Sequence, residues 1–191
     1  LSAIEACRAK NVLRWWFGQN NLVMPSTEHL NNLFTQLLSV RADASVQVKL
    51  QHLTLRRFQH RAYLCREENP SAENLTPYDL VWNGEAELLL PAGGKLLFKE
   101  VMGAGLARKL GVTKLRITNR GGGERFKPNK LRPTRTLKYL FQEAHIPPWQ
   151  RAVTPLVYWQ DSLIYVPNIG IAYEFQALQG EVGLEITWQP A

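Results

Sequence analysis

The spacing of apolar residues changes from a helical to a strand period near residue 45, and this change constrains the fold more than any other feature. Before it, apolar side chains recur three and four positions apart, at Leu30, Leu33, Phe34, Leu37 and Leu38. This spacing predicts a helix with one face towards a core, preceded by a first helix that ends near Gly18. After the change, Val46, Val48 and Leu50 alternate with polar residues, as in a half-buried strand. Residues 1–68 are therefore expected to form a helical hairpin with antiparallel strands.

The rest of the chain is expected to contain short strands and one helix. The strands are expected at about 85–90, 94–101, 113–118, 155–160, 163–166, 169–175 and 183–188. The helix is expected from Thr134, whose hydroxyl can cap it, to Ala144, with Pro147 and Pro148 ending it and Trp149 filling the core. The fold class is thus α+β: residues 1–68, a β-rich connecting segment at 69–112, and a small C-terminal α/β domain at 113–191.

The positive charge is concentrated in one segment. The whole chain has a net charge of +7, and residues 120–151 hold eight Lys and Arg residues against two acids, Glu124 and Glu143. Residues 152–191 hold four acids and no Lys or Arg. The eight cations are Arg120, Arg125, Lys127, Lys130, Arg132, Arg135, Lys138 and Arg151. Such a localised positive surface favours a polyanion as the partner, and all eight are candidate RNA-binding residues.

A glycine-rich loop begins this segment. Gly121, Gly122 and Gly123 would let backbone N–H groups approach a ligand, and the flanking cations favour phosphate. A flexible, solvated loop is the alternative. Arg132, Arg135 and Lys138 recur three residues apart, so they are expected to extend the positive surface along one helix face. Two roles are open for Arg151: a donor that stabilises the Pro-Pro corner, or a phosphate ligand.

No catalytic or metal-binding pattern accompanies the cations. The four histidines and two cysteines do not cluster, and Gly103–Ala104–Gly105 matches a dinucleotide loop only weakly, because Arg108 replaces its third glycine. No apolar run reaches the roughly 18 residues that a membrane span needs. We therefore expect no catalytic residue, no metal, no cofactor and no membrane contact in this chain, and a cytoplasmic location.

Several stretches resemble one family. GGGERFKP, LKYLFQEAHIPPWQR and TPLVYWQDSLIYVPNIG are similar to the C-terminal domain of tRNA(Ile)-lysidine synthetase. LRWWFGQNNLVMPSTEHLNNL, with the strands through Leu64, resembles that family's substrate-binding domain. One departure is Pro167–Asn168–Ile169–Gly170, where the family more often has a small residue before the glycine. The resemblance identifies residues 1–68 with the substrate-binding domain and residues 113–191 with the tRNA-binding C-terminal domain.

The resemblance implies a ligase that works on tRNA. In this family a separate N-terminal domain uses ATP, with Mg, to adenylate C2 of the wobble cytidine of tRNA(Ile), and lysine then displaces AMP. That domain carries a Ser-Gly-Gly-x-Asp-Ser loop, and no serine of this chain is followed by Gly-Gly. The chain also lacks an initiating Met, so we expect a piece of a longer product that is not catalytic alone.

The expected role of this piece is to hold the body and acceptor stem of the tRNA. Its expected partners are tRNA(Ile) and the enzyme's own N-terminal domain, with a homodimer left open. Two alternatives come from other classes: a stand-alone basic RNA-binding module without an enzyme partner, and a small enzyme that acts on a phosphorylated metabolite.

Overall fold

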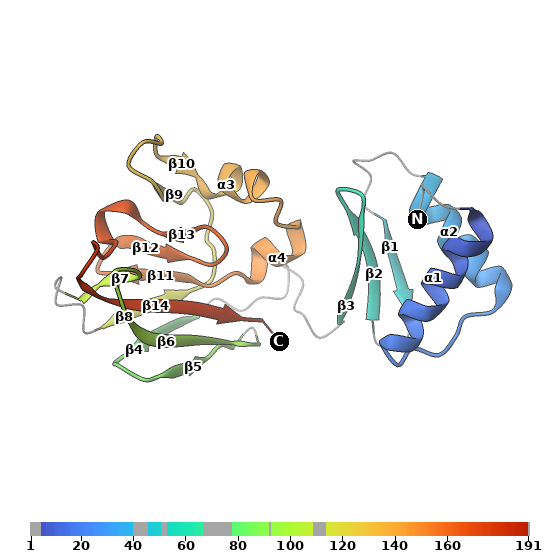
Figure 1. Ribbon diagram of the computed structural model, residues 1–191, viewed down its shortest axis with the longest axis horizontal. Coiled ribbons are helices and arrows are strands. Elements are labelled where there is room, and N and C mark those ends of the chain that lie inside the picture. Colours follow the sequence, from blue (N-terminus) through green and yellow to red (C-terminus); the bar gives the residue numbers. More distant parts are fainter. Residues whose placement is uncertain are drawn as a thin grey trace. The chain divides into compact units, whose positions relative to one another are not determined.

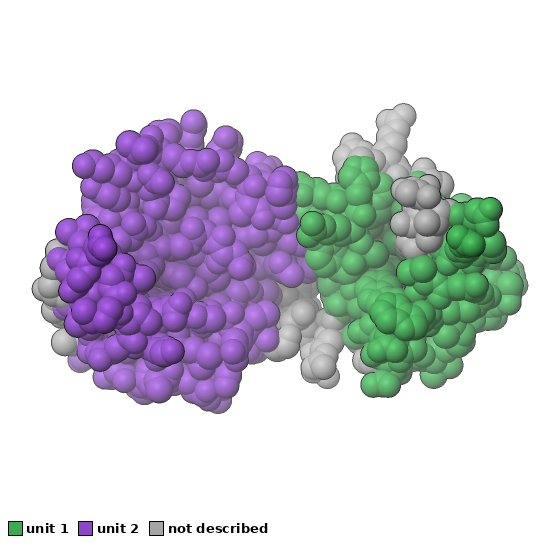
Figure 2. All heavy atoms as spheres, in the orientation of Figure 1, with its two compact units in different colours: residues 1–68 green, residues 69–191 purple. Residues whose placement is uncertain are grey.

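The computed structural model describes residues 5–39, 46–50, 53–66, 78–91, 93–108 and 114–190. The chain forms two compact units, residues 1–68 and residues 69–191 (Figures 1 and 2). Among the described residues, one hydrophobic core lies in unit 1 and two lie in unit 2. None of the described helices is long and apolar enough to cross a membrane.

Unit 1 contains the helices and strands that the apolar spacing predicts. They are α1 (Ala6–Gln19), α2 (Thr27–Ser39), β1 (Gln47–Leu50), β2 (Leu53–Phe58) and β3 (Arg61–Arg66). The strands form an antiparallel sheet in the order β1-β2-β3, and both helices lie on one side of it (Figure 1). Phe17, Leu30 and Leu33 of the helices share a core with Val46 and Leu55. This burial joins the helical and strand parts into one unit.

The described part of unit 2 contains two larger antiparallel sheets and one two-stranded sheet, made of β10 (Arg135–Thr136) and β9 (Arg125–Phe126). The five-stranded sheet has the order β13-β12-β11-β8-β4, made of β4 (Asp79–Trp82), β8 (Leu115–Thr118), β11 (Leu156–Trp159), β12 (Ser162–Val166) and β13 (Gly170–Ile171). The four-stranded sheet has the order β5-β6-β14-β7, made of β5 (Glu87–Leu89), β6 (Lys95–Met102), β7 (Leu106–Ala107) and β14 (Val182–Gln189). A core that includes Leu96, Ile117, Val157 and Leu184 joins the two sheets.

The segment expected to connect the two domains supplies strands to both sheets. β4 pairs with β8, and β6 pairs along its whole length with β14, from Lys95↔Gln189 to Met102↔Val182. The described strands of residues 69–112 are therefore structural parts of unit 2.

The second core of unit 2 lies between the five-stranded sheet and α3 (Leu137–Glu143). Leu137, Leu140 and Phe141 of this helix share the core with Leu156 and Val166 of the sheet. Neighbouring residues on a strand point to opposite faces. Leu156 therefore packs towards α3, and Val157 packs towards the other sheet.

The predicted helix from Thr134 begins later than expected. Arg135 and Thr136 form β10 (Arg135–Thr136), which pairs with β9 (Arg125–Phe126), so α3 begins only at Leu137. Thr136 is its N-cap, because its hydroxyl accepts a hydrogen bond from the Tyr139 N–H at 3.4 Å. The prediction of Thr134 as the cap was therefore wrong.

The end of α3 and the later strands also differ from the predictions. α3 ends at Glu143, and Pro148 occupies the first turn of a further helix, α4 (Pro148–Val153), where a missing N–H costs nothing. The strand expected over 169–175 is a short β13 followed by the 3₁₀ helix η2 (Tyr173–Phe175). At the corner formed by Pro147 and Pro148, Ile146 belongs to the core and is 5% exposed, whereas Trp149 is only half-buried.

Gly103–Ala104–Gly105 makes the turn between β6 and β7. Gly105 has a φ of +83°, and a Cβ at this position would lie 2.6 Å from the carbonyl oxygen of Leu184. Glycine is therefore needed for close packing of this turn against β14. The weak likeness to a dinucleotide loop reflects a structural turn.

The two aromatic residues near this corner should differ in their effect on stability. Phe141 is 0% exposed, so Phe141→Ala is expected to lower the free energy of unfolding by about 3–5 kcal/mol. Trp149→Ala should cost clearly less, because its side chain is only half-buried. Denaturant midpoints of both variants measure the difference, and an equal loss would show that Trp149 belongs to the core.

Candidate nucleic-acid interface

Residues 120–151 form the cationic segment. Within it, β9 and β10 form a two-stranded ribbon that leads directly into α3. In the ribbon, Arg135 pairs with Phe126 and Thr136 pairs with Arg125. The Leu137 N–H donates a hydrogen bond to the carbonyl oxygen of Glu124 at 2.9 Å, which ties the start of the helix to the start of the ribbon. β9, β10 and α3 lie beside one another in unit 2 (Figure 1).

Arg132, Arg135 and Lys138 do not share one helix face. Arg132 lies in the loop that connects β9 to β10, Arg135 lies on β10, and only Lys138 belongs to α3. The expectation of a helical stripe was wrong because the ribbon pairing delays the start of the helix.

Four cations of this segment are exposed and have no acidic partner among the described residues: Arg125, Lys130, Arg135 and Lys138. An Nη of Arg125 lies 3.5 Å from the carbonyl oxygen of Thr134. The Arg135 guanidinium lies 5.1 Å from the centre of the Tyr139 ring. These contacts orient the two guanidinium groups without neutralising them, so their charge remains available to an anion.

Two further cations are held by partners within the chain. Arg132 forms an ion pair with Glu143 at 2.8 Å. Lys127 is half-buried, with its ammonium 5.8 Å from the centre of the Tyr173 ring. These side chains are less available to an external anion than the four exposed cations.

Arg151 stabilises the corner after α3. Its Nε donates a hydrogen bond to the carbonyl oxygen of Ile146 at 2.6 Å. Burial, followed by the nearby charge of Arg120, lowers the pKa of Arg151. This hydrogen bond is the one expected of a corner donor, and the phosphate-ligand role of Arg151 stays a prediction.

The glycine loop closes on an internal carboxylate. Oε1 of Glu124 accepts hydrogen bonds from the N–H groups of Gly121 at 2.7 Å and Gly122 at 2.6 Å, and Nε of Arg120 lies 3.3 Å from Oε2. Gly122 and Gly123 have φ values of +97° and +84°, which explains why glycine is needed there. The sequence predicts that these N–H groups face a ligand, but two of them bind Glu124 instead.

The environment of Glu124 favours its charged form. Burial alone would raise the pKa of this carboxyl, but hydrogen bonds from the backbone, including those from Gly122 and Gly121, and one from Arg120 outweigh it. The net effect is a pKa below the ordinary value of glutamate. The loop is thus held by an ionised side chain.

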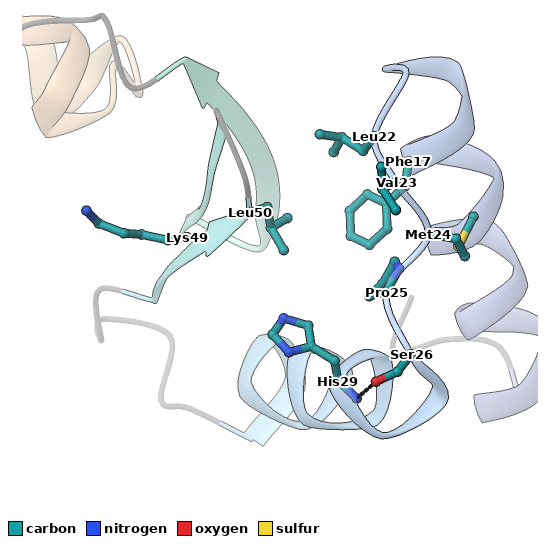
Figure 3. Close-up of a pocket in the computed structure, with 9 residues that line it drawn as sticks. All are labelled: Phe17, Leu22, Val23, Met24, Pro25, Ser26, His29, Lys49 and Leu50. Atoms are coloured by element: carbon teal, nitrogen blue, oxygen red, sulfur yellow. Dashed lines mark hydrogen bonds between the residues drawn. The ribbon is translucent and has the colours of Figure 1, made fainter.

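Unit 1 contains a cavity of about 360 Å³ (Figure 3). Its lining is mostly apolar and includes Phe17, Leu22 and Leu50. The polar residue Ser26 accepts a hydrogen bond at its Oγ from the backbone N–H of His29 at 3.2 Å. Among the described residues, no group of three His, Cys, Asp or Glu side chains is arranged to hold a metal ion.

An acid titration should reveal the lowered pKa of Glu124. A carboxyl group whose pKa is lower in the folded state stabilises the fold at pH values above its ordinary pKa. This stabilisation is lost as the pH falls through the pKa of the folded state. The amide proton shifts of Gly121 and Gly122, measured by NMR, are expected to change below the ordinary glutamate pKa of about 4.3. A midpoint at or above that value would contradict the hydrogen bonding described for Glu124.

Comparisons with known proteins match a family domain to each of the two units. The model of the TilS substrate binding domain matches residues 1–63, and that of the TilS substrate C-terminal domain matches residues 115–188. The tRNA(Ile)-lysidine synthase of Nitrosomonas europaea is 34% identical over 197 residues, which cover 100% of this chain and 42% of that protein. The synthase of Coxiella burnetii is 34% identical over 184 residues, which cover 96% of this chain and 40% of that protein.

A solved structure described as "Crystal structure of TILS C-terminal domain" is 22% identical and has a TM-score of 0.47, covering 59% of this chain and 98% of its own. The chain spans about two fifths of the length of the two synthases, 42% and 40%. The two domain matches, in this order, and the synthase relatives show that the chain belongs to the tRNA(Ile)-lysidine synthase family, of which it contains the substrate-binding and C-terminal domains.

Proposed function

We propose that this chain is the tRNA-recognition part of a tRNA(Ile)-lysidine synthase. In this proposal it holds the body and acceptor stem of tRNA(Ile), while a separate N-terminal domain uses ATP, with Mg, to join lysine to C2 of the wobble cytidine. The names of the relatives support this assignment, as does the match to two domains named for the substrate. The relatives are synthases, which favours this function over a stand-alone RNA-binding module.

The observation that carries the proposal is the group of exposed cations at Arg125, Lys130, Arg135 and Lys138, none of which has an acidic partner among the described residues. Cations that neutralise phosphates release condensed counterions from RNA, and this release supplies much of the affinity. The planar fork of arginine also suits two-point contact with phosphate, whereas lysine acts as a point charge. We propose these four residues as the direct phosphate ligands.

The other four cations of the segment have a secondary part in the proposed interface. Arg120, Lys127, Arg132 and Arg151 each have a partner within the chain. They contribute to the positive field that attracts RNA, which acts beyond direct contact. Their main contribution is to shape the surface on which the exposed cations stand.

The third candidate, an enzyme for a phosphorylated metabolite, rested on the glycine loop. Glu124 occupies the N–H groups of Gly121 and Gly122 that such a phosphate would need.

Replacing Arg125, Lys130 and Arg135 together by alanine tests the proposed function. The triple variant is expected to bind tRNA(Ile) at least about tenfold more weakly at moderate salt, with a log-log salt slope flatter by about two to three units. Filter binding across a salt series measures both quantities. The fold should be unaffected, because the three side chains are exposed.

A control removes three exposed cations outside the cationic segment: Lys99, Lys114 and Arg108, of which Arg108 forms an ion pair with Glu100 at 3.2 Å. It changes the net charge by the same amount, so it separates local contact from the overall field. The proposal is contradicted if the two triple variants lose the same affinity, or if the first keeps the affinity and slope of the original chain.

A further inference from the structure

Glu124 is one of the two acids in the cationic segment, and it directly follows the three glycines of the loop. Its side chain is only 10% exposed, and that of its partner Arg120 is 24% exposed. Burying a carboxylate in a surface proposed to bind an anion opposes binding electrostatically. Its position therefore needs a reason other than direct contact with RNA.

The contacts of Glu124 join three parts of the segment. Its carboxylate holds the turn at Gly121 and Gly122, and its carbonyl oxygen accepts the N–H of Leu137, the first residue of α3. The next residue along the chain, Arg125, begins β9. Glu124 thus connects the glycine turn, the ribbon and the helix.

A wider charge network surrounds Glu124. Burial of Tyr158 raises its pKa, and the negative charge of Glu124 raises it further. Burial of Arg151 lowers its pKa, and the positive charge of Arg120 lowers it further. The Arg116 guanidinium in turn lies 4.8 Å from the centre of the Tyr158 ring. The Glu124 carboxylate thus forms an ion pair with Arg120 and acts electrostatically on Tyr158 of the neighbouring strand β11.

We propose that Glu124 is a positioning residue for RNA binding, a role that rests on the proposed function. It holds the glycine turn in the one conformation that sets the start of β9 and directs Arg125 outwards. Without the carboxylate, two N–H donors of the turn lose their acceptor, and Gly122 and Gly123 gain backbone freedom. The loop must then be ordered when RNA binds, and this ordering lowers affinity.

This role and simple electrostatics predict opposite signs. If charge alone decides affinity, removing Glu124 should strengthen RNA binding, because it removes a negative charge. If Glu124 positions the loop, its removal should weaken binding. Glu143 provides the matched control, since it lies in the same segment but pairs with the exposed Arg132 and has a side chain that is 40% exposed.

The experiment compares Glu124→Ala, Glu124→Gln and Glu143→Ala in tRNA(Ile) binding over a salt series. Glu124→Ala is expected to weaken binding by about fivefold or more and to flatten the salt slope, because ordering the loop now costs free energy and fewer phosphate contacts form. Glu124→Gln should recover most of the affinity, because its amide oxygen can accept the two N–H bonds. Glu143→Ala should bind as tightly as the original chain or more tightly.

The salt slope separates positioning from a general loss of fold. Partly unfolded protein lowers the active fraction but leaves the slope of the remaining folded molecules unchanged. If Glu124→Ala does not fold, Glu124→Asp decides: it keeps the charge but shortens the reach to the glycine turn, and it should bind about threefold or more weakly.

Affinity of Glu124→Ala equal to or above that of the original chain overturns the role, as does an equal loss in Glu143→Ala. When Glu124→Ala does not fold, unchanged affinity of Glu124→Asp overturns it. Failure of the proposed function is a separate result, because the triple variant of Arg125, Lys130 and Arg135 retains Glu124.

Discussion

Burial of the apolar face of α3 on the five-stranded sheet determines how the cationic segment is presented. Leu137, Phe141 and Phe126 belong to one core with the sheet residue Leu156. Because neighbouring side chains on a strand point to opposite faces, the burial of Phe126 on β9 leaves Arg125 exposed. On α3, Leu137, Leu140 and Phe141 form the buried face, and Lys138 lies outside this face and is exposed. The hydrophobic core and the proposed RNA surface are therefore two sides of the same elements.

The cationic segment divides its charges between structure and surface. Arg120, Arg132 and Arg151 are held by Glu124, Glu143 and the carbonyl oxygen of Ile146. A count of positive charges in the sequence therefore overstates the number available for phosphate contact. The two acids of the segment also differ in kind, because Glu143 makes an exposed ion pair, whereas Glu124 holds backbone N–H groups. The proposed interface therefore consists of a few exposed cations, and three other cations of the segment are held by hydrogen bonds and ion pairs within the chain.

Local patterns in the sequence predict the elements of unit 1 and the location of the cations, because apolar spacing and charge are local properties. The strand pairing of unit 2 is not local: Val81 pairs with Arg116, and Leu96 pairs with Trp188. Thr134 and Thr136 are both suitable helix caps, and the pairing of β9 with β10 decides between them. The role of Glu124 was missed because its partners are backbone groups, although an acid three residues after Gly121 in a cationic loop was a usable signal.

The central claim is that the surface formed by the ribbon and α3 contacts tRNA through its exposed cations. Acetylation of lysines in the presence and absence of tRNA(Ile), quantified by mass spectrometry, tests it on the unaltered chain. Lys130 and Lys138 should become protected, while the exposed residues Lys99 and Lys114 serve as internal controls and should react equally in both samples. Equal modification of Lys130 and Lys138 with and without tRNA, or equal protection of all four lysines, would contradict the account.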